Sequence, residues 1–154
     1  MHVSEILRFK GSTLYTVTPE TSLSECVIVM ADQDIGSLVV MDKGRLVGLI
    51  TFREVIVVLA SRQREQRSGP TPPVSELQAR DVMNPEPAVA TPEMDVNGLR
   101  RAMIDSHQRY LPVMDAGTLM GVVSFHDVAR VVLEEQSFEN RMLKAYIQDR
   151  PAEA

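Results

Sequence analysis

An internal repeat without insertions constrains the fold of this chain more than any other feature. When the sequence is shifted against itself by 73 positions, residues 16–58 align with residues 89–131 without a gap, and 15 of the 43 aligned pairs are identical. The identities include a Thr-Pro pair and two glycines. Matches of this kind at one constant offset are typical of internal duplication. The chain is therefore predicted to contain two copies of one structural unit.

Each copy has the same order of hydrophobic patterns. A short apolar segment stops at the Thr-Pro pair, because proline cannot donate to a strand ladder. Apolar residues then recur at helical spacing, and two further apolar segments flank an Asp-x-Gly turn of the kind that closes hairpins. A second helix ends the copy. The predicted unit is β-α-β-β-α, with strands at residues 15–17, 38–41 and 46–50 and a closing helix from 52 to about 66 in the first copy, and strands at 88–90, 111–114 and 119–123 and a closing helix from 125 to about 136 in the second.

The remaining segments define the predicted domain organisation. Polar residues rich in proline separate the copies and indicate a linker. Residues 3–7 and 79–83 resemble each other at an offset of 76 and are predicted to be short lead-in turns. The prediction is an α+β (α/β) fold with pseudo-twofold symmetry, in which residues 1–66 form the first repeat with its lead-in, 67–78 the linker, 79–136 the second repeat and 137–154 a C-terminal helix and tail.

Composition and charge narrow the functional classes. The net charge of −5 argues against a general nucleic-acid-binding surface, which usually needs a clustered basic face. No apolar run approaches the roughly 18 residues of a membrane span, and the N-terminus lacks a signal-peptide pattern. The single cysteine, Cys26, lies among apolar residues at helical spacing and is predicted to be a small core residue. We expect a cytoplasmic protein without a disulfide.

The repeat, its turn and its closing motif together resemble the cystathionine-β-synthase (CBS) domain. The resemblance rests on the Thr-Pro start, the segment Asp-Gln-Asp-Ile-Gly-Ser-Leu-Val-Val at residues 32–40, the Asp-x-Gly hairpin and the close Gly-x-x-Ser/Thr-x-x-Asp/Glu-Val. Two such domains in tandem resemble a Bateman module, and the lead-in and tail are similar to small stand-alone bacterial CBS-pair proteins. The resemblance covers nearly the whole chain.

This resemblance implies a regulatory module, usually a dimer in which four repeats form a flat disc. The implied ligand is an adenine nucleotide, with AMP first and ADP, ATP or NAD as the other candidates; some members bind S-adenosylmethionine. The module would pass its bound state to a partner protein whose identity the sequence does not reveal. No catalytic arrangement stands out, so the chain is not expected to be an enzyme. With three histidines and no paired ligands at fixed spacing, no metal site is expected either.

The twin motifs Ser124-x-x-Asp127 and Thr51-x-x-Glu54 allow two interpretations. Each is predicted to lie where a strand passes into a helix, and each matches a capping box, in which hydroxyl and carboxylate satisfy backbone N–H groups at the helix start. The same helix start can also bind a phosphate. A short carboxylate nearby can accept hydrogen bonds from both hydroxyls of a ribose, which is the role of the acid in the CBS family. Glu54 suits the cap better, and Asp127 suits the ribose better.

The family's site lies between repeats, and its positions are carried over as two expected pockets. Arg109 would reach the phosphates of the first, because a guanidinium matches phosphate geometry. The first pocket would be lined by Thr18, Leu23, Ile35, Gly36, Arg109, Val122, Ser124, His126 and Asp127. The second, weaker pocket would be lined by Leu49, Thr51, Arg53, Glu54, Thr91, Val96 and Gln108, together with Gly36 and Arg109.

An alternative function is a dimerisation adaptor that is indifferent to nucleotides. It rests on the closing helix of the first copy, which is apolar on every side from residue 55 to residue 60. We expect a symmetric copy of the chain to bury the apolar faces of the two closing helices. The residues expected in that interface are Val55, Val58, Leu59, Val128, Val131 and Val132. The tail is expected to place Phe138, Met142, Ala145 and Tyr146 on one face and to cover this module or its partner.

Overall fold

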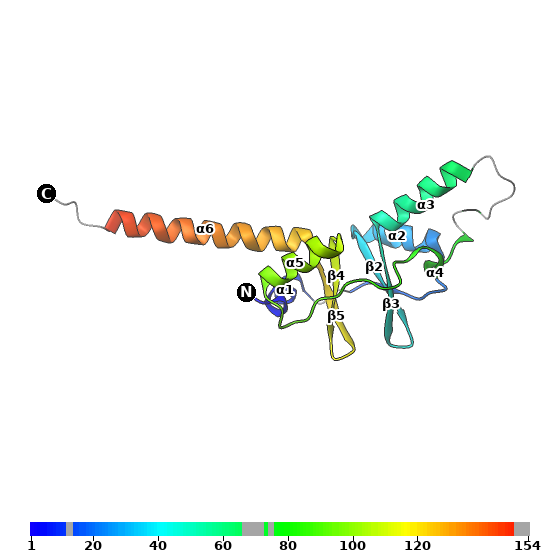
Figure 1. Ribbon diagram of the computed structural model, residues 1–154, viewed down its shortest axis with the longest axis horizontal. Coiled ribbons are helices and arrows are strands. Elements are labelled where there is room, and N and C mark those ends of the chain that lie inside the picture. The colour runs from blue at the N-terminus through cyan, green and yellow to red at the C-terminus, as the bar shows by residue number, and fades with distance from the viewer. Residues whose placement is uncertain (12–13, 66–72, 74–75, 150–154) are drawn as a thin grey trace.

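The computed structural model describes the whole chain except residues 12–13, 66–72, 74–75 and 150–154. Most of the predicted linker therefore lies outside the described residues. The elements follow the order α1 (Val3–Lys10), β1 (Thr16–Val17), α2 (Leu23–Gln33), β2 (Ser37–Asp42), β3 (Arg45–Thr51), α3 (Phe52–Glu65), α4 (Ala79–Val82), α5 (Val96–Ser106), β4 (Tyr110–Asp115), β5 (Thr118–Ser124) and α6 (Phe125–Asp149). The predicted α+β fold with two tandem units is confirmed. Figure 1 shows the hairpins of the two units side by side at the centre of the molecule.

The two hairpins have the same construction. Strand β2 pairs antiparallel with β3, and β4 pairs antiparallel with β5. Their turns use Lys43 and Gly44 at φ 51° and 78°, and Ala116 and Gly117 at φ 48° and 85°. Two consecutive positive φ angles are the mark of a type I′ turn, whose twist matches that of the strands it joins. The predicted Asp-x-Gly hairpins are confirmed.

The first strand differs between the units. In the first unit β1 pairs in parallel with β2, as predicted. In the second unit the predicted strand at residues 88–90 is reduced to one bridge between Ala90 and Val113. The Gln108 side chain bonds both the N–H and the carbonyl of Ala88, at 2.7 and 3.2 Å. Pro112, which takes the place of Val39, has no N–H to donate, so the longer ladder cannot form.

The helices after the Thr-Pro pairs begin at side-chain caps. The Ser22 hydroxyl accepts a hydrogen bond from the Glu25 N–H at 3.1 Å, and the Asp95 carboxylate accepts one from the Gly98 N–H at 2.7 Å. These bonds satisfy donors that a helix start leaves unpaired. The stripe predicted for α2 comprised Leu23, Cys26, Val27 and Met30, and the structure buries all of these except Val27, which is 39% exposed. Helix α5 buries its predicted stripe of Val96, Leu99 and Met103.

The two lead-in helices are exchanged between the units. Helix α1 packs into the second unit, where Val3 and Ile6 join its hydrophobic core. Helix α4 packs into the first unit, where Ala79 and Val82 join the other core. Figure 1 shows the same arrangement, with α1 beside β5 and α4 beside α2. Each core is therefore completed by a helix that precedes the other repeat in the sequence.

Matching backbone bonds hold the exchanged helices. The Val3 N–H donates to the Met94 carbonyl at 2.9 Å, and the Ala79 N–H donates to the Thr21 carbonyl at 2.8 Å. Each pair places the first residue of a lead-in helix against the loop that follows a Thr-Pro pair. The lead-ins were predicted as short turns, but α1 continues to Lys10 and forms a helix of 8 residues.

Two glycines give the exchanged helices room to approach the hairpins. A Cβ added at Gly48 in β3 would lie 2.3 Å from the sulfur of Met83, and one added at Gly121 in β5 would lie 2.9 Å from a methyl carbon of Leu7. Gly48 and Gly121 are repeat partners. Both glycines lie in strands and not in turns, so close packing of a neighbouring side chain, and not backbone conformation, explains them, more tightly at Gly48 than at Gly121.

The closing helices bury different residues from those expected for a dimer interface. Val128 and Val131 are 4% and 5% exposed and belong to the core of their own unit. Val55, Val58 and Val132 also pack against their own cores. Val128 and Val131 are therefore not available to a second copy, whereas Val55, Val58 and Val132 are partly buried and Leu59 is exposed, at 52%. The exposed apolar stripe of α3 is formed instead by Phe52, Ile56 and Leu59.

Helix α6 is one element of 25 residues, so the predicted C-terminal helix is present as its continuation and not as a separate helix. No glycine or proline interrupts residues 125–149, and the helical pattern continues through Ser137. Figure 1 shows the second half of α6 extending away from the rest of the molecule. Its apolar side chains Phe138, Met142 and Tyr146 are 57–67% exposed. None of the described helices has the length and apolarity to cross a membrane.

Candidate functional site

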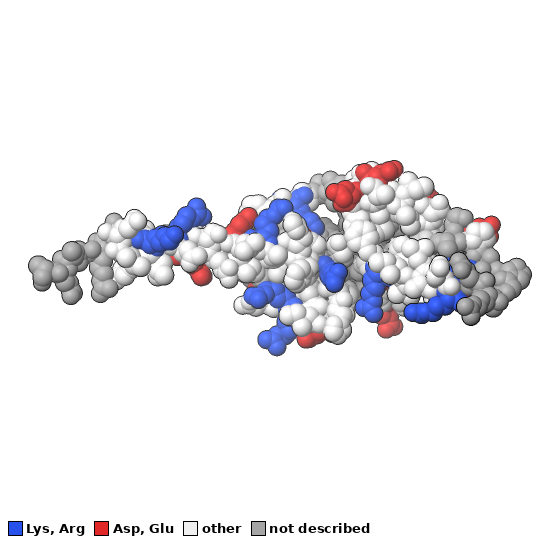
Figure 2. All heavy atoms as spheres, turned by 90° about the horizontal axis from the view of Figure 1, so that it is seen from above, with Lys and Arg blue, Asp and Glu red and all other residues white. Residues whose placement is uncertain are grey.

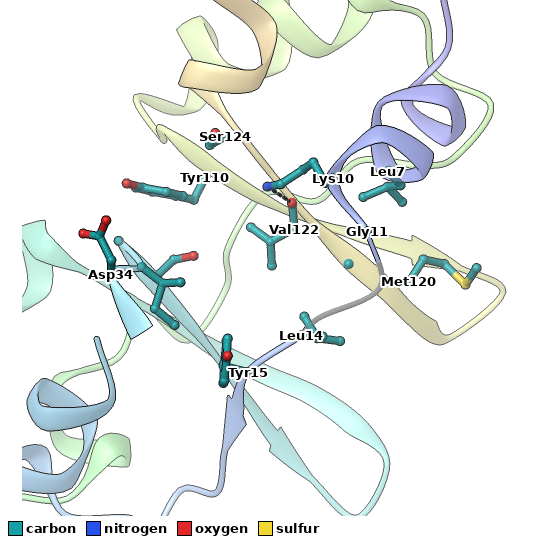
Figure 3. Close-up of a pocket in the computed structure, with 14 residues that line it drawn as sticks. Leu7, Lys10, Gly11, Leu14, Tyr15, Asp34, Tyr110, Met120, Val122 and Ser124 are labelled. Atoms are coloured by element: carbon teal, nitrogen blue, oxygen red, sulfur yellow. Dashed lines mark hydrogen bonds between the residues drawn. The ribbon is translucent and has the colours of Figure 1, made fainter. Parts of the chain in front are cut away.

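A pocket of about 380 Å³ lies between the two units. Its walls come from the end of α1, the segment leading into β1, the turn between α2 and β2, and strands β4 and β5 (Figure 3). Tyr15 and Tyr110 are its aromatic side chains, and Ser124 lies at its β5 end. The volume is within the range of small-molecule sites, which combine apolar walls with a few polar groups.

A capping box stands at the start of α6. The Asp127 carboxylate accepts a hydrogen bond from the Ser124 N–H at 2.8 Å, and the Ser124 hydroxyl accepts one from the Asp127 N–H at 3.1 Å. Asp127 is 7% exposed, and it is the one charged residue in the described chain that is buried. The cap therefore holds a carboxylate at the wall between the units.

Lys10 is the ionic partner of this buried carboxylate. Its ammonium lies 2.7 Å from Asp127 Oδ2. It also donates to the Val122 carbonyl at 2.7 Å, the bond drawn as a dashed line in Figure 3. Lys10 is the last residue of α1, so the exchange of lead-in helices delivers this cation to the second unit. Charged groups buried in proteins are usually paired in this way.

The twin box at the start of α3 is self-contained. The Glu54 carboxylate accepts hydrogen bonds from the Thr51 N–H, at 3.0 Å, and from the Thr51 hydroxyl. The Arg53 N–H in turn donates to the Thr51 hydroxyl at 3.1 Å. The longer glutamate side chain can reach back to its own cap, so it serves the capping interpretation well.

The structure brings four residues of the first predicted site into the pocket wall and leaves the others outside it. Leu23 is 1% exposed and points into the core of the first unit. Thr18 pairs with the Thr21 hydroxyl at 3.0 Å. Arg109 and His126 are exposed and do not line the pocket. Asp127 lines an adjoining cavity of about 230 Å³. The four residues in the wall are Ile35, Gly36, Val122 and Ser124.

The residues of the second predicted site do not surround one of the described cavities. Val96 and Leu49 are buried, and the Leu49 backbone bonds Asn84 in both directions at 2.9 and 3.0 Å. Gln108 bonds Ala88, and Thr91 is exposed. Arg53 and Glu54 line a separate cavity of about 460 Å³ along α3. Thr51 remains in its cap.

Sequence reasoning missed the pocket residues that depend on long-range packing. Leu7 comes from the lead-in that was predicted as a turn, Lys10 lies three residues beyond that predicted turn, and Tyr110 comes from the start of β4. Alignment of the two repeats offered one signal. Tyr110 aligns with Ser37, so the second unit has an aromatic ring where the first unit has a small hydroxyl side chain. A Cβ added at Gly36 would lie 1.9 Å from the Tyr110 hydroxyl, so this tyrosine closes the contact between the units.

Other chemistries find less support in the described part of the chain. No group of three or more His, Cys, Asp or Glu side chains there is placed to hold a metal ion. Cys26 is buried, and desolvation, followed by the charge of Glu25, raises the pKa of its thiol to about 11. A neutral buried thiol is a poor nucleophile. The basic side chains visible in Figure 2 are separated by uncharged surface and do not gather in one patch.

Comparison with known proteins identifies similar chains. The model of the CBS domain family matches residues 3–61 and 79–134. A 17.7 kDa protein of Acidianus ambivalens is 30% identical over 138 residues, which cover 88% of this chain and 77% of the relative. The mitochondrial CBS domain-containing protein CBSX3 of Arabidopsis thaliana is 30% identical over an alignment of 156 positions that covers 95% of this chain and 71% of the relative.

Solved structures share the fold. A protein with CBS domains from Burkholderia ambifaria is 26% identical, with a TM-score of 0.76 over 88% of this chain and 96% of the other. CBSX2 in complex with AMP is 23% identical, with a TM-score of 0.69 over 88% and 98%. The CBS domain pair of MJ0100, in complex with 5′-methylthioadenosine and S-adenosyl-L-methionine, is 20% identical, with a TM-score of 0.73 over 88% and 98%.

Proposed function

The chain belongs to the CBS domain family, and from this premise we propose that it is a regulatory module that binds an adenosine-containing ligand between its two repeats. The ligand would be an adenine nucleotide, with AMP as the first candidate and ADP, ATP or NAD as the others. The bound state would be passed to a partner protein in the cytoplasm. The module itself would carry out no reaction.

The observation that carries this proposal is the pocket between the repeats. It joins segments from both units, including Gly36 from the first and Ser124 from the second. A ligand seated there contacts both units, so it stabilises whichever relative arrangement offers the better contacts. Structures of the same fold hold AMP in CBSX2 and S-adenosyl-L-methionine in MJ0100, which supports an adenosine-containing ligand for this pocket.

Each side of the pocket would have a separate task. Tyr15 and Tyr110 are the aromatic side chains that could pack against a base. Ser124, at the end of β5, would form a hydrogen bond with a polar group of the ligand. Its own N–H is bonded to the Asp127 carboxylate. The second predicted pocket, around Thr51 and Glu54, would bind more weakly because its residues do not surround one described cavity.

A dimerisation adaptor is the second candidate. It is favoured by the self-contained boxes, because Asp127 and Glu54 both have partners within the chain. It is also favoured by the exposed stripe of α3, whose Phe52, Ile56 and Leu59 are 52–63% exposed. We propose that this stripe forms a homodimer interface in either case. The adaptor differs from the sensor in its indifference to nucleotides.

Calorimetric titration of AMP, ADP, ATP and NAD separates the two candidates. Ser124→Ala should weaken AMP binding at least about fivefold, because it removes a hydroxyl from the pocket wall. Thr51→Ala is the matched control, since it removes the twin hydroxyl from the other capping box and both variants lose a similar cap energy of about 1 kcal/mol. Thr51→Ala should leave the tighter binding event unchanged.

The absence of binding by any of the four nucleotides would favour the adaptor. An equal effect of the two variants on AMP affinity would instead contradict the assignment of the ligand to the pocket beside Ser124. A thermal melt gives an independent measurement, because a ligand at 100 times its dissociation constant adds about 2.7 kcal/mol to the free energy of unfolding.

A further inference from the structure

Lys10 occupies an unusual place in the pocket. It is the one basic side chain among the residues that line the pocket, and it also lines the adjoining cavity into which Asp127 is exposed. The two cavities share Lys10 and no other described residue. The lysine side chain therefore separates the pocket from the buried carboxylate.

The ion pair determines the charge that a ligand meets at this wall. Lys10 is 32% exposed and Asp127 is 9% exposed as side chains, so the cation is the part of the pair nearer to solvent. With Lys10 present the pair is neutral overall, and Lys10 is the member of the pair that lines the pocket. Without Lys10 the same wall would carry the uncompensated negative charge of Asp127, in a setting that water screens poorly.

The opposite side of the pocket carries Asp34, which is exposed and ends helix α2 (Figure 3). Charges exposed to water are screened more strongly than partly buried ones. Asp34 therefore influences a bound ligand less than the Lys10 and Asp127 pair does. The twin of Lys10 at the lead-in offset is Glu86, so the second repeat's lead-in supplies no corresponding cation.

We infer that Lys10 makes the pocket selective for anionic adenine nucleotides over neutral adenosine and over the cationic S-adenosylmethionine. The inference rests on the proposed function, since it concerns the same pocket. A phosphate accepts hydrogen bonds from an ammonium and gains from its charge. A sulfonium cation gains nothing from the same wall. Lys10 is thus a specificity-determining residue, and Asp127 is the group that holds it in position.

The test compares AMP, adenosine and S-adenosylmethionine by calorimetry on four proteins. In Lys10→Met the affinity for AMP should fall about tenfold, which corresponds to about 1.4 kcal/mol, while that for adenosine should change less than about twofold. S-adenosylmethionine should bind more tightly to this variant than to the unmodified protein. Lys10→Arg should keep the preference for AMP, and Lys144→Met, on the exposed second half of α6, is the matched control and should change nothing.

The double variant Lys10→Met/Asp127→Asn removes both charges and serves if Lys10→Met alone fails to fold. It should bind AMP and adenosine with similar affinity. An unchanged ratio of AMP to adenosine affinity, in the single or the double variant, would overturn the inference and leave the proposed function standing. Equal binding of AMP and adenosine by the unmodified protein would do the same. If the unmodified protein binds none of the three, the proposed function fails and the inference fails with it.

Discussion

Asp127 shows how a single residue can serve the fold and the pocket together. Its carboxylate caps α6 through the Ser124 N–H and pairs with Lys10 from the far end of the chain. The cap is local and the ion pair spans the molecule. A substitution at this position is therefore expected to loosen both the helix start and the attachment of α1.

Asp127→Ala should lower the free energy of unfolding by about 2–4 kcal/mol, because it leaves the Lys10 ammonium and the Ser124 N–H without their acceptor. The measurement is urea denaturation at neutral pH. The matched control is Glu20→Gln, which breaks the ion pair between Glu20 and Arg80, at 2.6 Å but with side chains 49–60% exposed. This control should cost less than about 1 kcal/mol. Equal losses would show that burial of Asp127 contributes nothing.

Cys26 should make stability depend on pH in the alkaline range. Burial raises the pKa of its thiol from 9.0 to about 11, so the folded state holds the proton more tightly than the unfolded state does. The free energy of unfolding is unaffected by this group below about pH 9 and falls as the pH rises from about 9 toward 11. Cys26→Ala should remove this part of the slope and leave a constant offset from lost packing.

The check is the difference between the unfolding free energies of the two proteins near pH 8 and near pH 10, which cancels the titration of the tyrosines and lysines. A difference that stays constant between the two pH values would contradict the prediction. The folded protein should also react slowly with thiol reagents near pH 8, and the urea-unfolded protein should react rapidly.

The sequence predicts those features of the site that depend on contacts between residues close together in the chain. The boxes at Ser124 and Thr51 involve residues three apart, so their geometry follows from the helix start alone. Leu23 and Val96 were carried over from the family pattern, although their helical spacing also marked them as core, and the structure places both in the cores. Lys10 could not be found in this way, because its partner lies more than 100 residues away in the sequence.

At the scale of helices and strands, local patterns predicted well where tertiary packing agreed with them. The hairpins and the helices α2 and α5 follow from turn chemistry and apolar spacing. The lost strand at residues 88–90 depends on the Gln108 side chain, which competes for the backbone of Ala88. The helical character of α1 depends on its burial in the second unit, where Val3 and Ile6 are 0% and 2% exposed. Neither effect can be inferred from the segment itself.

The paired glycines allow a test of how the lead-in helices dock. Gly48→Ala should lower the free energy of unfolding by about 1–3 kcal/mol, because the new Cβ meets three atoms of Met83 at 2.3 to 3.0 Å. Gly121→Ala should cost less than about 1 kcal/mol, since it meets the flexible end of Leu7 at 2.9 Å. Both glycines lie in strands, so the change in backbone entropy is similar.

Chemical denaturation of the two variants measures this difference. The double variant Gly48→Ala/Met83→Ala should recover part of the loss, because shortening Met83 removes the sulfur and Cγ contacts. Equal costs for the two single variants, or no recovery in the double variant, would mean that the glycines are not selected by the docking of α1 and α4.

At the scale of the whole molecule, the apolar surface indicates association. The exposed stripe of α3 and the second half of α6 leave Ile56, Leu59, Phe138 and Tyr146 in solvent. Surfaces of this kind are usually covered by another molecule. The sequence predicted that the closing helices would carry this surface, but it included Val128 and Val131, which the structure buries in their own core. Periodicity alone does not tell the side of a helix that faces its own sheet from the side that faces outward.

Ile56→Glu should shift the proposed dimer to monomer without unfolding the chain, since Ile56 is 63% exposed and is not one of the buried core residues. Ile104→Glu is the matched control, because Ile104 is 67% exposed on α5, and it should leave association unchanged. Sedimentation velocity at micromolar concentration measures the mass, and far-UV circular dichroism verifies the fold. A monomeric unmodified protein, or a dimeric Ile56→Glu variant, would rule out an interface centred on α3.

Because α1 and α4 are exchanged, the sequence repeat does not coincide with the set of residues that forms one hydrophobic core. The first core is built from one continuous stretch that extends through α4, whereas the second core needs both the beginning of the chain and its second half. A chain cut in the linker would therefore not separate into two halves, because each half keeps a helix that the other needs. In architectural terms the molecule corresponds to a domain-swapped dimer of single repeats that has become one polypeptide. A lone copy of the repeat would have to bind a second copy before its own core was complete. Pairing is therefore a condition for folding of the repeat, and the linker holds the two copies together.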